Sequence, residues 1–177
     1  MTKKLILFLG LMLSSASLLG DEVDLSAVSS LTVDLDAVVE LGQVHPVDGV
    51  TTAGQPDEAS LKVFADSGYV AVIDLRTEGE DRGIDEPAAV EALGMDYINL
   101  PIGRDGITYA NAKVLRDAIA SYDEPVLVHC GSSNRVGALF ALQAFSETGN
   151  VDVALEAGRA AGLTRMEDTV RGVIEAE

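Results

Sequence analysis

Apolar positions in this chain gather into short runs that are separated by amphipathic stretches. A continuous apolar run of four to eight residues between turn formers is typical of a strand buried on both faces of a sheet. Tyr69–Leu75 and Pro125–His129 fit this description, and Met95–Leu100, which stops at a proline, predicts a further strand. Upstream, Val44–Ala53 contains a proline and a glycine, which predicts a short strand or a hairpin.

Helical spacing and helix-end residues predict the segments between these strands. Asp57–Ser67 follows a proline, carries acidic residues in its first turn and stops at a glycine, as helices commonly do. Thr108–Tyr122 repeats apolar residues at the helical period, at Ala112, Leu115, Ile119 and Tyr122. The remaining predicted helices are Asp85–Leu93, Arg135–Thr148, Val151–Ala161 and Met166–Ala176.

This alternation predicts an α/β fold with a mainly parallel central sheet flanked by helices. Ligands of such folds bind beyond the carboxyl ends of the strands, where a loop leads into a helix. We therefore expect the functional residues in three loops, which follow the predicted strands at Asp74–Arg76, Pro101–Thr108 and His129–Arg135.

The first 43 residues differ from the rest. Two lysines, an apolar centre and small residues predict a secretory signal peptide over residues 1–20, followed by an acidic lead-in segment over residues 21–43 and the domain over residues 44–177. The apolar centre is shorter than a membrane span needs. We therefore expect a secreted or periplasmic protein, without stable membrane insertion after cleavage.

Composition narrows the function classes. The chain has 12 basic and 29 acidic residues, a net charge of −17, and losing Lys3 and Lys4 with the signal would leave 10 and 29, or −19. Such a chain repels phosphate backbones, so nucleic acid is not an expected partner. One cysteine excludes a disulfide scaffold, and one cysteine with two histidines is too few for a His/Cys metal cluster. No metal and no cofactor are expected.

The third loop carries the candidate chemistry. His129 and Cys130 end a buried strand, and Gly131, Ser132, Ser133 and Asn134 lead to Arg135 at the start of an apolar helix. Backbone N–H groups at such a turn form an anion-binding nest. The helix dipole and an adjacent arginine favour the thiolate of a cysteine placed there, and arginine can grip an oxyanion through two N–H bonds. A buried, inert thiol is the alternative interpretation.

The sequence here resembles a known family. The string HCGSSNRVGAL after PVLV, with TAGQP (Thr52–Pro56) and VIDLR (Val72–Arg76) upstream, is similar to the bacterial beta-lactamase hydrolase-like phosphatases. These are nonclassical relatives of eukaryotic dual-specificity and tyrosine phosphatases, and some members are described as sulfurtransferases. The resemblance implies a cysteine-phosphatase-like fold over about residues 44–163, with Cys130 as nucleophile and Arg135 as phosphate clamp. It also implies phosphate binding by Gly131, Ser132, Ser133 and Asn134.

Two departures from the larger phosphatase superfamily weigh against turnover. Four residues separate Cys130 from Arg135, where those enzymes place five, and rhodanese-like sulfurtransferases have the shorter loop. Val136 stands where many phosphatases carry a hydroxyl residue that helps the thiolate leave.

Asp105, 25 residues before Cys130, is the candidate general acid, since related phosphatases use an aspartate on an upstream loop. An Asp-Gly turn is the alternative. Arg104 is expected either to meet substrate or to pair with an acid. Asp74 and Arg76 suit a structural pair as well as a substrate contact, and His129 is expected to orient the loop from within the fold.

Three functions follow from these residues. The first is a phosphatase that hydrolyses a phosphate monoester through a phosphocysteine. The second is a sulfurtransferase that carries sulfane sulfur as a Cys130 persulfide, and the third is a non-catalytic oxyanion-binding module. The large negative charge leaves Arg135 and the loop amides as the expected anion attractors, which favours a small or weakly charged substrate.

Overall fold

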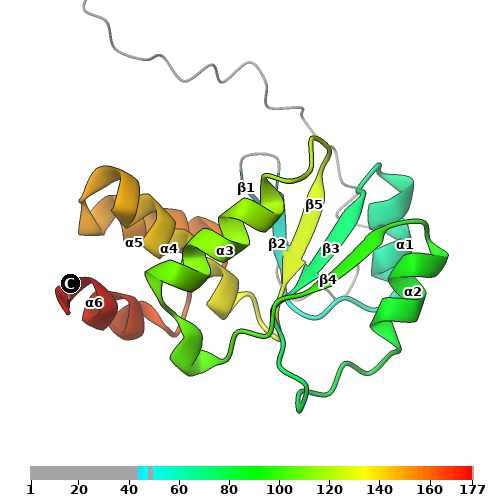
Figure 1. Cartoon of the computed structure of the whole chain (residues 1–177), viewed down its shortest axis with the longest axis horizontal. Coiled ribbons are helices and arrows are strands. Elements are labelled where there is room, and N and C mark those ends of the chain that lie inside the picture. The colour runs from blue at the N-terminus through cyan, green and yellow to red at the C-terminus, as the bar shows by residue number, and fades with distance from the viewer. Residues whose placement is uncertain (1–43, 48–49, 177) are drawn as a thin grey trace, which may run out of the picture.

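A computed structural model describes residues 44–47 and 50–176 of the chain, so the predicted signal peptide and acidic lead-in segment lie outside the described residues. One five-stranded sheet has the order β1-β2-β5-β3-β4, with helices on both faces (Figure 1). β1 pairs antiparallel with β2, and all other neighbouring strands are parallel. The strands are β1 (Val44–Val47), β2 (Val50–Ala53), β3 (Ala71–Asp74), β4 (Asp96–Asn99) and β5 (Val126–His129).

The predicted α/β class is confirmed, and the stretch Val44–Ala53 forms two paired strands. Every predicted helix is present, and each helix end lies within three residues of the predicted one. The helices are α1 (Glu58–Asp66), α2 (Glu86–Ala92), α3 (Tyr109–Ile119), α4 (Asn134–Thr148), α5 (Val151–Ala160) and α6 (Glu167–Glu175). None of the helices in the described part of the chain is both long enough and apolar enough to cross a membrane.

Each face of the sheet supports its own apolar core, because side chains alternate between the two faces along a strand. Val72 and Leu127 pack with Leu61 and Phe64 of α1 and with Val90 of α2. The next residues along these strands, Ile73 and Val128, point to the other face. The larger core on that face includes side chains from α3, α4, α5 and α6. All four residues of β2, β3 and β5 are buried, as the apolar runs predict for β3 and β5.

The strand register brings the candidate loops to one edge of the sheet. Ala53 pairs with His129, His129 with Asp74, and Asp74 with Asn99, so the carboxyl ends of β2, β5, β3 and β4 form a single row. The three loops in which the sequence places the functional residues all leave the sheet at this edge or just beyond it.

Two glycines allow α4 and α5 to pack backbone against backbone. A Cβ on Gly137 would lie 2.6 Å from the Gly158 carbonyl oxygen, and one on Gly158 would lie 2.8 Å from the Gly137 carbonyl oxygen. This contact holds the segment after α5, residues 161–166, against the start of α4. That segment therefore reaches the loop that follows β5.

Candidate active site

Cys130 follows β5 directly and is 1% exposed. Its backbone N–H donates to the Ala53 carbonyl at 3.3 Å, which continues the pairing of β5 with β2. Gly54 then forms an isolated bridge with Ser132, so the residues after β2 support one side of the loop. The thiol thus lies at the inner end of the loop, where the sheet ends and α4 begins.

Ser133 provides the tight turn into α4. It is the single non-glycine residue with a positive φ, 59°, in the part of the chain that the structure describes. Its buried hydroxyl donates to the Ala161 carbonyl at 3.0 Å. The predicted phosphate contact of Ser133 is therefore not one that its hydroxyl makes in this conformation, and a contact through the backbone N–H stays a prediction.

Asn134 ties the loop to the segment after α5. Its side-chain oxygen accepts hydrogen bonds from the backbone N–H groups of Thr164 at 2.8 Å and Arg165 at 2.7 Å. Its amide nitrogen donates to the Thr164 hydroxyl at 2.9 Å. The predicted phosphate ligand Asn134 is thus engaged in holding a second segment next to the site.

Arg135, in the first turn of α4, is paired with a carboxylate that the sequence analysis missed. Its Nη1 donates to Glu80 Oε1 at 2.6 Å, and its Nη2 donates to Glu80 Oε2. Nη1 also donates to the Ile102 carbonyl at 3.1 Å, which comes from the loop after β4. Both terminal nitrogens of the predicted phosphate clamp therefore face Glu80.

Glu80 is held in place by the turn that carries it. Its Oε1 accepts hydrogen bonds from the backbone N–H of Thr77 at 2.9 Å and from the Thr77 hydroxyl at 3.1 Å. Its Oε2 lies 3.8 Å from the position that a Cβ on Gly131 would occupy, so the carboxylate sits against the loop after Cys130. The sequence signal was the Thr-x-x-Glu spacing after β3, a pattern in which the two residues bond to each other.

The contact between Glu80 and Arg135 shifts the pKa values of both side chains. The hydrogen bonds from Arg135 lower the pKa of Glu80 to about 2, against a smaller opposing effect of burial. Burial lowers the pKa of Arg135, but Glu80 and the Cys130 sulfur together outweigh that effect and raise it above its ordinary value. The guanidinium thus interacts with both the Glu80 carboxylate and the candidate nucleophile.

A buried polar cluster lies beneath the loop. The guanidinium of Arg76 donates to both oxygens of Asp74, at 2.9 and 3.1 Å, and to Glu86 in the first turn of α2. His129 Nε2 lies 2.8 Å from Glu86 Oε1. Asp74 and Arg76 are therefore a structural pair, and His129 is held within the fold as expected.

Hydrogen bonds keep Asp74 ionised in this cluster. Burial alone would raise its pKa, but Arg76, His129 and the Tyr97 hydroxyl, which donates at 2.8 Å, together lower the pKa to about 2. Burial and this bond to Asp74 raise the pKa of Tyr97 to about 12. Asp74, Glu86 and His129 offer ligand atoms within 4.8 Å of one another, as a cation site would. The Arg76 guanidinium already bonds to both carboxylates and supplies that positive charge.

Asp105, the candidate general acid, is exposed and lies in a short 3₁₀ helix at Arg104–Gly106. The preceding residues, Gly103 and Arg104, line the pocket at the loop, whereas Asp105 is not among the lining residues. The structure thus brings its segment to the site, and its role as general acid stays a prediction.

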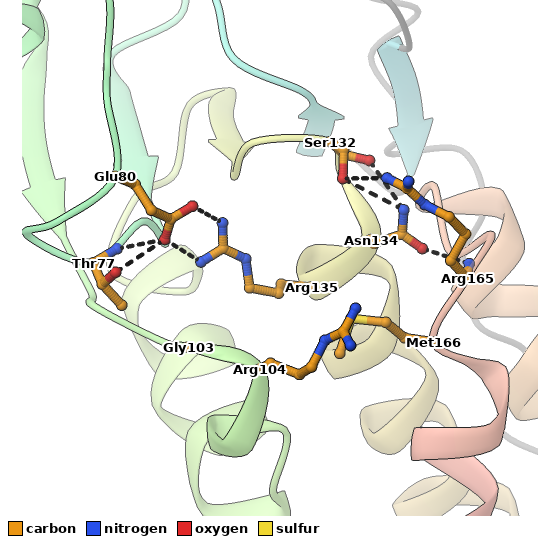
Figure 2. Close-up of a pocket in the computed structure, with 9 residues that line it drawn as sticks. All are labelled: Thr77, Glu80, Gly103, Arg104, Ser132, Asn134, Arg135, Arg165 and Met166. Carbon is orange, nitrogen blue, oxygen red and sulfur yellow. Dashed lines mark hydrogen bonds and ion pairs between the residues drawn. The ribbon is translucent and has the colours of Figure 1, made fainter.

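The pocket itself is a cavity of about 420 Å³ beside the Cys130–Arg135 loop (Figure 2). Its lining residues come from the loops after β3, β4, β5 and α5, and they are Thr77, Glu80, Gly103, Arg104, Ser132, Asn134, Arg135, Arg165 and Met166. The expectation that Arg135 and the loop amides attract anions alone was incomplete, because Arg104 and Arg165 share the pocket. Arg165 lies 30 residues beyond Arg135, and no local pattern joins the two.

Together these residues can bind an oxyanion next to a thiol. The loop offers backbone N–H groups at the start of α4, and Arg135 offers a fork of N–H donors suited to two oxygens of one anion. An anion that takes both terminal nitrogens of Arg135 must displace Glu80, since the carboxylate occupies them now.

Comparisons with known proteins agree with this arrangement. A family model described as beta-lactamase hydrolase-like protein, phosphatase-like domain, matches residues 46–147. The chain is 38% identical over 94 residues to a beta-lactamase hydrolase-like protein of Xylella fastidiosa, and 32% identical over 97 residues to one of Agrobacterium fabrum. These matches cover 51% and 52% of this chain but 22% of each relative, so the chain spans about a fifth of their length.

Solved structures show the same fold at lower identity. A candidate phosphatase of Neisseria meningitidis superposes with a TM-score of 0.61 at 20% identity, over 77% of this chain and 98% of that one. TpbA of P. aeruginosa superposes with a TM-score of 0.57 at 19% identity, over 78% and 92%. The fold is therefore that of the cysteine-phosphatase-like proteins. Because the family model matches more than half of the sequence, the chain belongs to the family of the phosphatase-like domain of beta-lactamase hydrolase-like proteins.

Proposed function

We propose that this phosphatase-type protein hydrolyses a small phosphate monoester through a phosphocysteine on Cys130. The observation that carries the proposal is the loop itself, in which the buried Cys130 follows β5 directly and Arg135, in the first turn of α4, lines a 420 Å³ pocket. The Cys130 sulfur is among the groups that raise the pKa of Arg135, which supports an arginine near the nucleophile.

The reaction uses these groups in two steps. The Cys130 thiolate attacks phosphorus, the bond from phosphorus to the ester oxygen breaks, and the leaving oxygen takes a proton from Asp105. Water then attacks the phosphocysteine and gives a proton to the Asp105 carboxylate; the phosphorus–sulfur bond breaks, which releases inorganic phosphate and restores the thiolate and the protonated Asp105. Arg135 and the loop N–H groups stabilise the charge on the three remaining phosphate oxygens in both steps.

Arg135 becomes available for this task when substrate replaces Glu80. Phosphate carries more charge than a carboxylate and offers the same paired oxygens, so it competes well for the guanidinium. A cysteine-to-serine variant of TpbA has been crystallised with phosphotyrosine, which supports a phosphorylated ligand for this fold.

A sulfurtransferase remains the second candidate because of one specific feature, the four-residue spacing between Cys130 and Arg135. In that reaction the Cys130 thiolate attacks the sulfane sulfur of thiosulfate and releases sulfite. The resulting persulfide then passes its terminal sulfur to cyanide, which becomes thiocyanate, and the thiolate is restored. Both reactions start from the same nucleophile, so substrate choice separates them.

Two assays on the purified protein without residues 1–20 decide between these functions. We expect phosphate release from 4-nitrophenyl phosphate, abolished in Cys130→Ser. Thiocyanate formation from thiosulfate and cyanide without phosphate release would overturn the proposal in favour of sulfur transfer. If neither product forms, while phosphate still protects Cys130 from iodoacetamide, the protein is an oxyanion-binding module.

We also propose that the domain acts outside the cytoplasm, as a secreted or periplasmic protein. The support is the order of lysines, apolar centre and small residues in positions 1–20. Mass spectrometry of the N-terminus of protein from the periplasmic or culture fraction should find a chain that begins between residues 18 and 21. An intact N-terminus in the cytoplasmic fraction would contradict export.

A further inference from the structure

Most positive charges in the described part of the chain are neutralised by a neighbouring carboxylate. Seven of its ten lysines and arginines have a carboxylate oxygen within 4.0 Å. The three without one are Arg104, Arg165 and Arg171. Two of these three line the pocket at the Cys130 loop, although the chain offers more than twice as many acids as bases.

Arg165 is fixed relative to the loop through its backbone. Its N–H donates to Asn134 Oδ1 at 2.7 Å, and its side-chain Nη2 lies 3.4 Å from the Ser132 hydroxyl (Figure 2). The side chain is exposed, and within the described part of the chain its guanidinium makes one hydrogen bond, the long one to this neutral hydroxyl. Its charge is therefore available to a ligand in the pocket.

Arg104 is fixed through the loop after β4. The Gly106 N–H donates to the Gly103 carbonyl at 3.0 Å, and Asn111 donates to the Gly106 carbonyl at 2.8 Å. Ile102, two residues before Arg104, accepts a hydrogen bond from Arg135. The Arg104 side chain extends toward Met166 in the view of the pocket (Figure 2).

Three guanidinium groups thus line one cavity, and Glu80 is the only carboxylate among the lining residues. Like charges that line one cavity repel one another unless a ligand neutralises them. A cavity of about 420 Å³ also lies within the usual range for a small-molecule site, and is larger than one phosphate group requires.

We propose that Arg104 and Arg165 form a second anion subsite, so that the substrate is a small phosphate monoester with a second anionic group, either phosphate or carboxylate. This inference rests on the proposed phosphatase function, with the scissile phosphate on Arg135. It replaces the expectation of a weakly charged substrate, because the local charge of the pocket is opposite to that of the whole molecule.

Matched substrates test the subsite. Phosphate release is measured from phenyl phosphate, 3-carboxyphenyl phosphate and benzene-1,3-diyl bisphosphate, which share the aryl ester and differ in the second group. We expect kcat/KM for at least one doubly anionic substrate to exceed that for phenyl phosphate about tenfold. The substrate with the larger increase in kcat/KM over phenyl phosphate identifies the second group as carboxylate or phosphate.

Substitutions then test whether the two arginines cause the higher kcat/KM for doubly anionic substrates. Arg104→Gln and Arg165→Gln should each remove most of the preference, and the double variant should remove all of it. Arg171→Gln is the matched control, since Arg171 is an exposed and unpaired arginine outside the pocket, and it should keep the full preference. Equal preference in wild type and double variant, or no preference in wild type, would overturn the proposal.

A binding measurement separates failure of the subsite from failure of the phosphatase proposal. Calorimetry compares methylphosphonate with methylenebisphosphonate, neither of which has an ester bond to cleave. Tighter binding of the bisphosphonate by wild type, lost in the double variant, supports the subsite even if no ester is hydrolysed. Equal affinities of both ligands for wild type would overturn it, whatever the activity.

Discussion

Glu80 holds the guanidinium that the substrate needs. Because the pKa of Glu80 is about 2, the carboxylate is ionised at any ordinary assay pH, and the anion must compete with it for Arg135. Neutralising Glu80 weakens that competition. We predict that Glu80→Gln lowers KM for 4-nitrophenyl phosphate about threefold to tenfold, as measured by initial rates at pH 6 to 7.

The matched control for this prediction is Glu78→Gln. Glu78 is an exposed glutamate of the same loop and is not among the residues that line the pocket, so its KM should stay at the wild-type value. A higher KM together with a lower kcat in Glu80→Gln would contradict the prediction. It would show that Glu80 positions Arg135 for substrate.

Asp105 can be tested independently of its distance from the thiol. A general acid acts in its protonated form, so the reaction slows as pH rises and the group loses its proton. We predict that Asp105→Asn lowers kcat about 100-fold and removes the decline of kcat at high pH. Asp123→Asn, which changes an exposed aspartate before β5, serves as control. A wild-type pH profile in Asp105→Asn would exclude Asp105 as the acid.

At this scale the sequence predicted only part of the site. Cys130, Arg135 and the loop between them could be proposed because they are contiguous and carry a recognisable order of residue types, and their roles stay predictions. Glu80 lies 55 residues from Arg135, and Arg165 lies 31 residues from Asn134, so only the fold brings them together. Ser133 was assigned to phosphate by its position, yet its hydroxyl bonds to the Ala161 carbonyl.

The helices around α4 depend on an approach that only glycine allows. A Cβ on Gly137 would meet the Gly158 carbonyl and the Leu163 backbone, neither of which can move without shifting a whole segment. We predict that Gly137→Ala lowers the free energy of unfolding by about 2–3 kcal/mol, despite the better helix propensity of alanine. Urea unfolding followed by circular dichroism measures this change.

Gly172→Ala is the control for this prediction, because we expect it to stabilise the protein. Gly172 lies inside α6, and a Cβ there would meet no atom within 4 Å. The change should therefore stabilise the protein by about 0.5–1 kcal/mol through the gain in helix propensity alone. Equal effects of the two substitutions would contradict the account of the α4 and α5 contact.

The elements were predictable for a simple reason. Strands buried on both faces leave continuous apolar runs, and helix ends leave caps, as at Asp57, whose side chain accepts from the Ser60 N–H at 2.8 Å. α4 begins at Asn134, one residue before its predicted start, because the turn into it is made by Ser133 with a positive φ. No propensity rule favours serine in that conformation.

The free energy of unfolding of the whole molecule should depend on pH because of the buried cluster that contains Asp74. The pKa of Asp74 is about 2 in the folded protein and lies below its ordinary value of 3.8. Its contribution to stability is therefore complete above pH 4 to 5 and is lost as pH falls through 2. We predict that the wild-type free energy of unfolding falls across this range.

Asp74→Asn tests the origin of this acid sensitivity. Removing one charge from a buried network leaves Arg76 with Glu86 as its one carboxylate partner, so the variant should lose about 3–5 kcal/mol at pH 7. It should also show a shallower decline between pH 5 and pH 2 than wild type. Tyr97→Phe, which removes one bond to Asp74, is a milder variant with the same direction. Parallel pH curves for all three proteins would contradict the assignment to Asp74.

The antiparallel β1 has a consequence for how the domain can be attached to anything else. Val44 pairs with Ala53, and Ala53 pairs with His129, so the chain enters the sheet at the edge where the pocket lies, two strands away from Cys130. Glu175, in contrast, lies at the far end of α6 from Met166, which lines the pocket. A fluorophore placed just before β1 would therefore sense events at the pocket, whereas an immobilising tag belongs after α6.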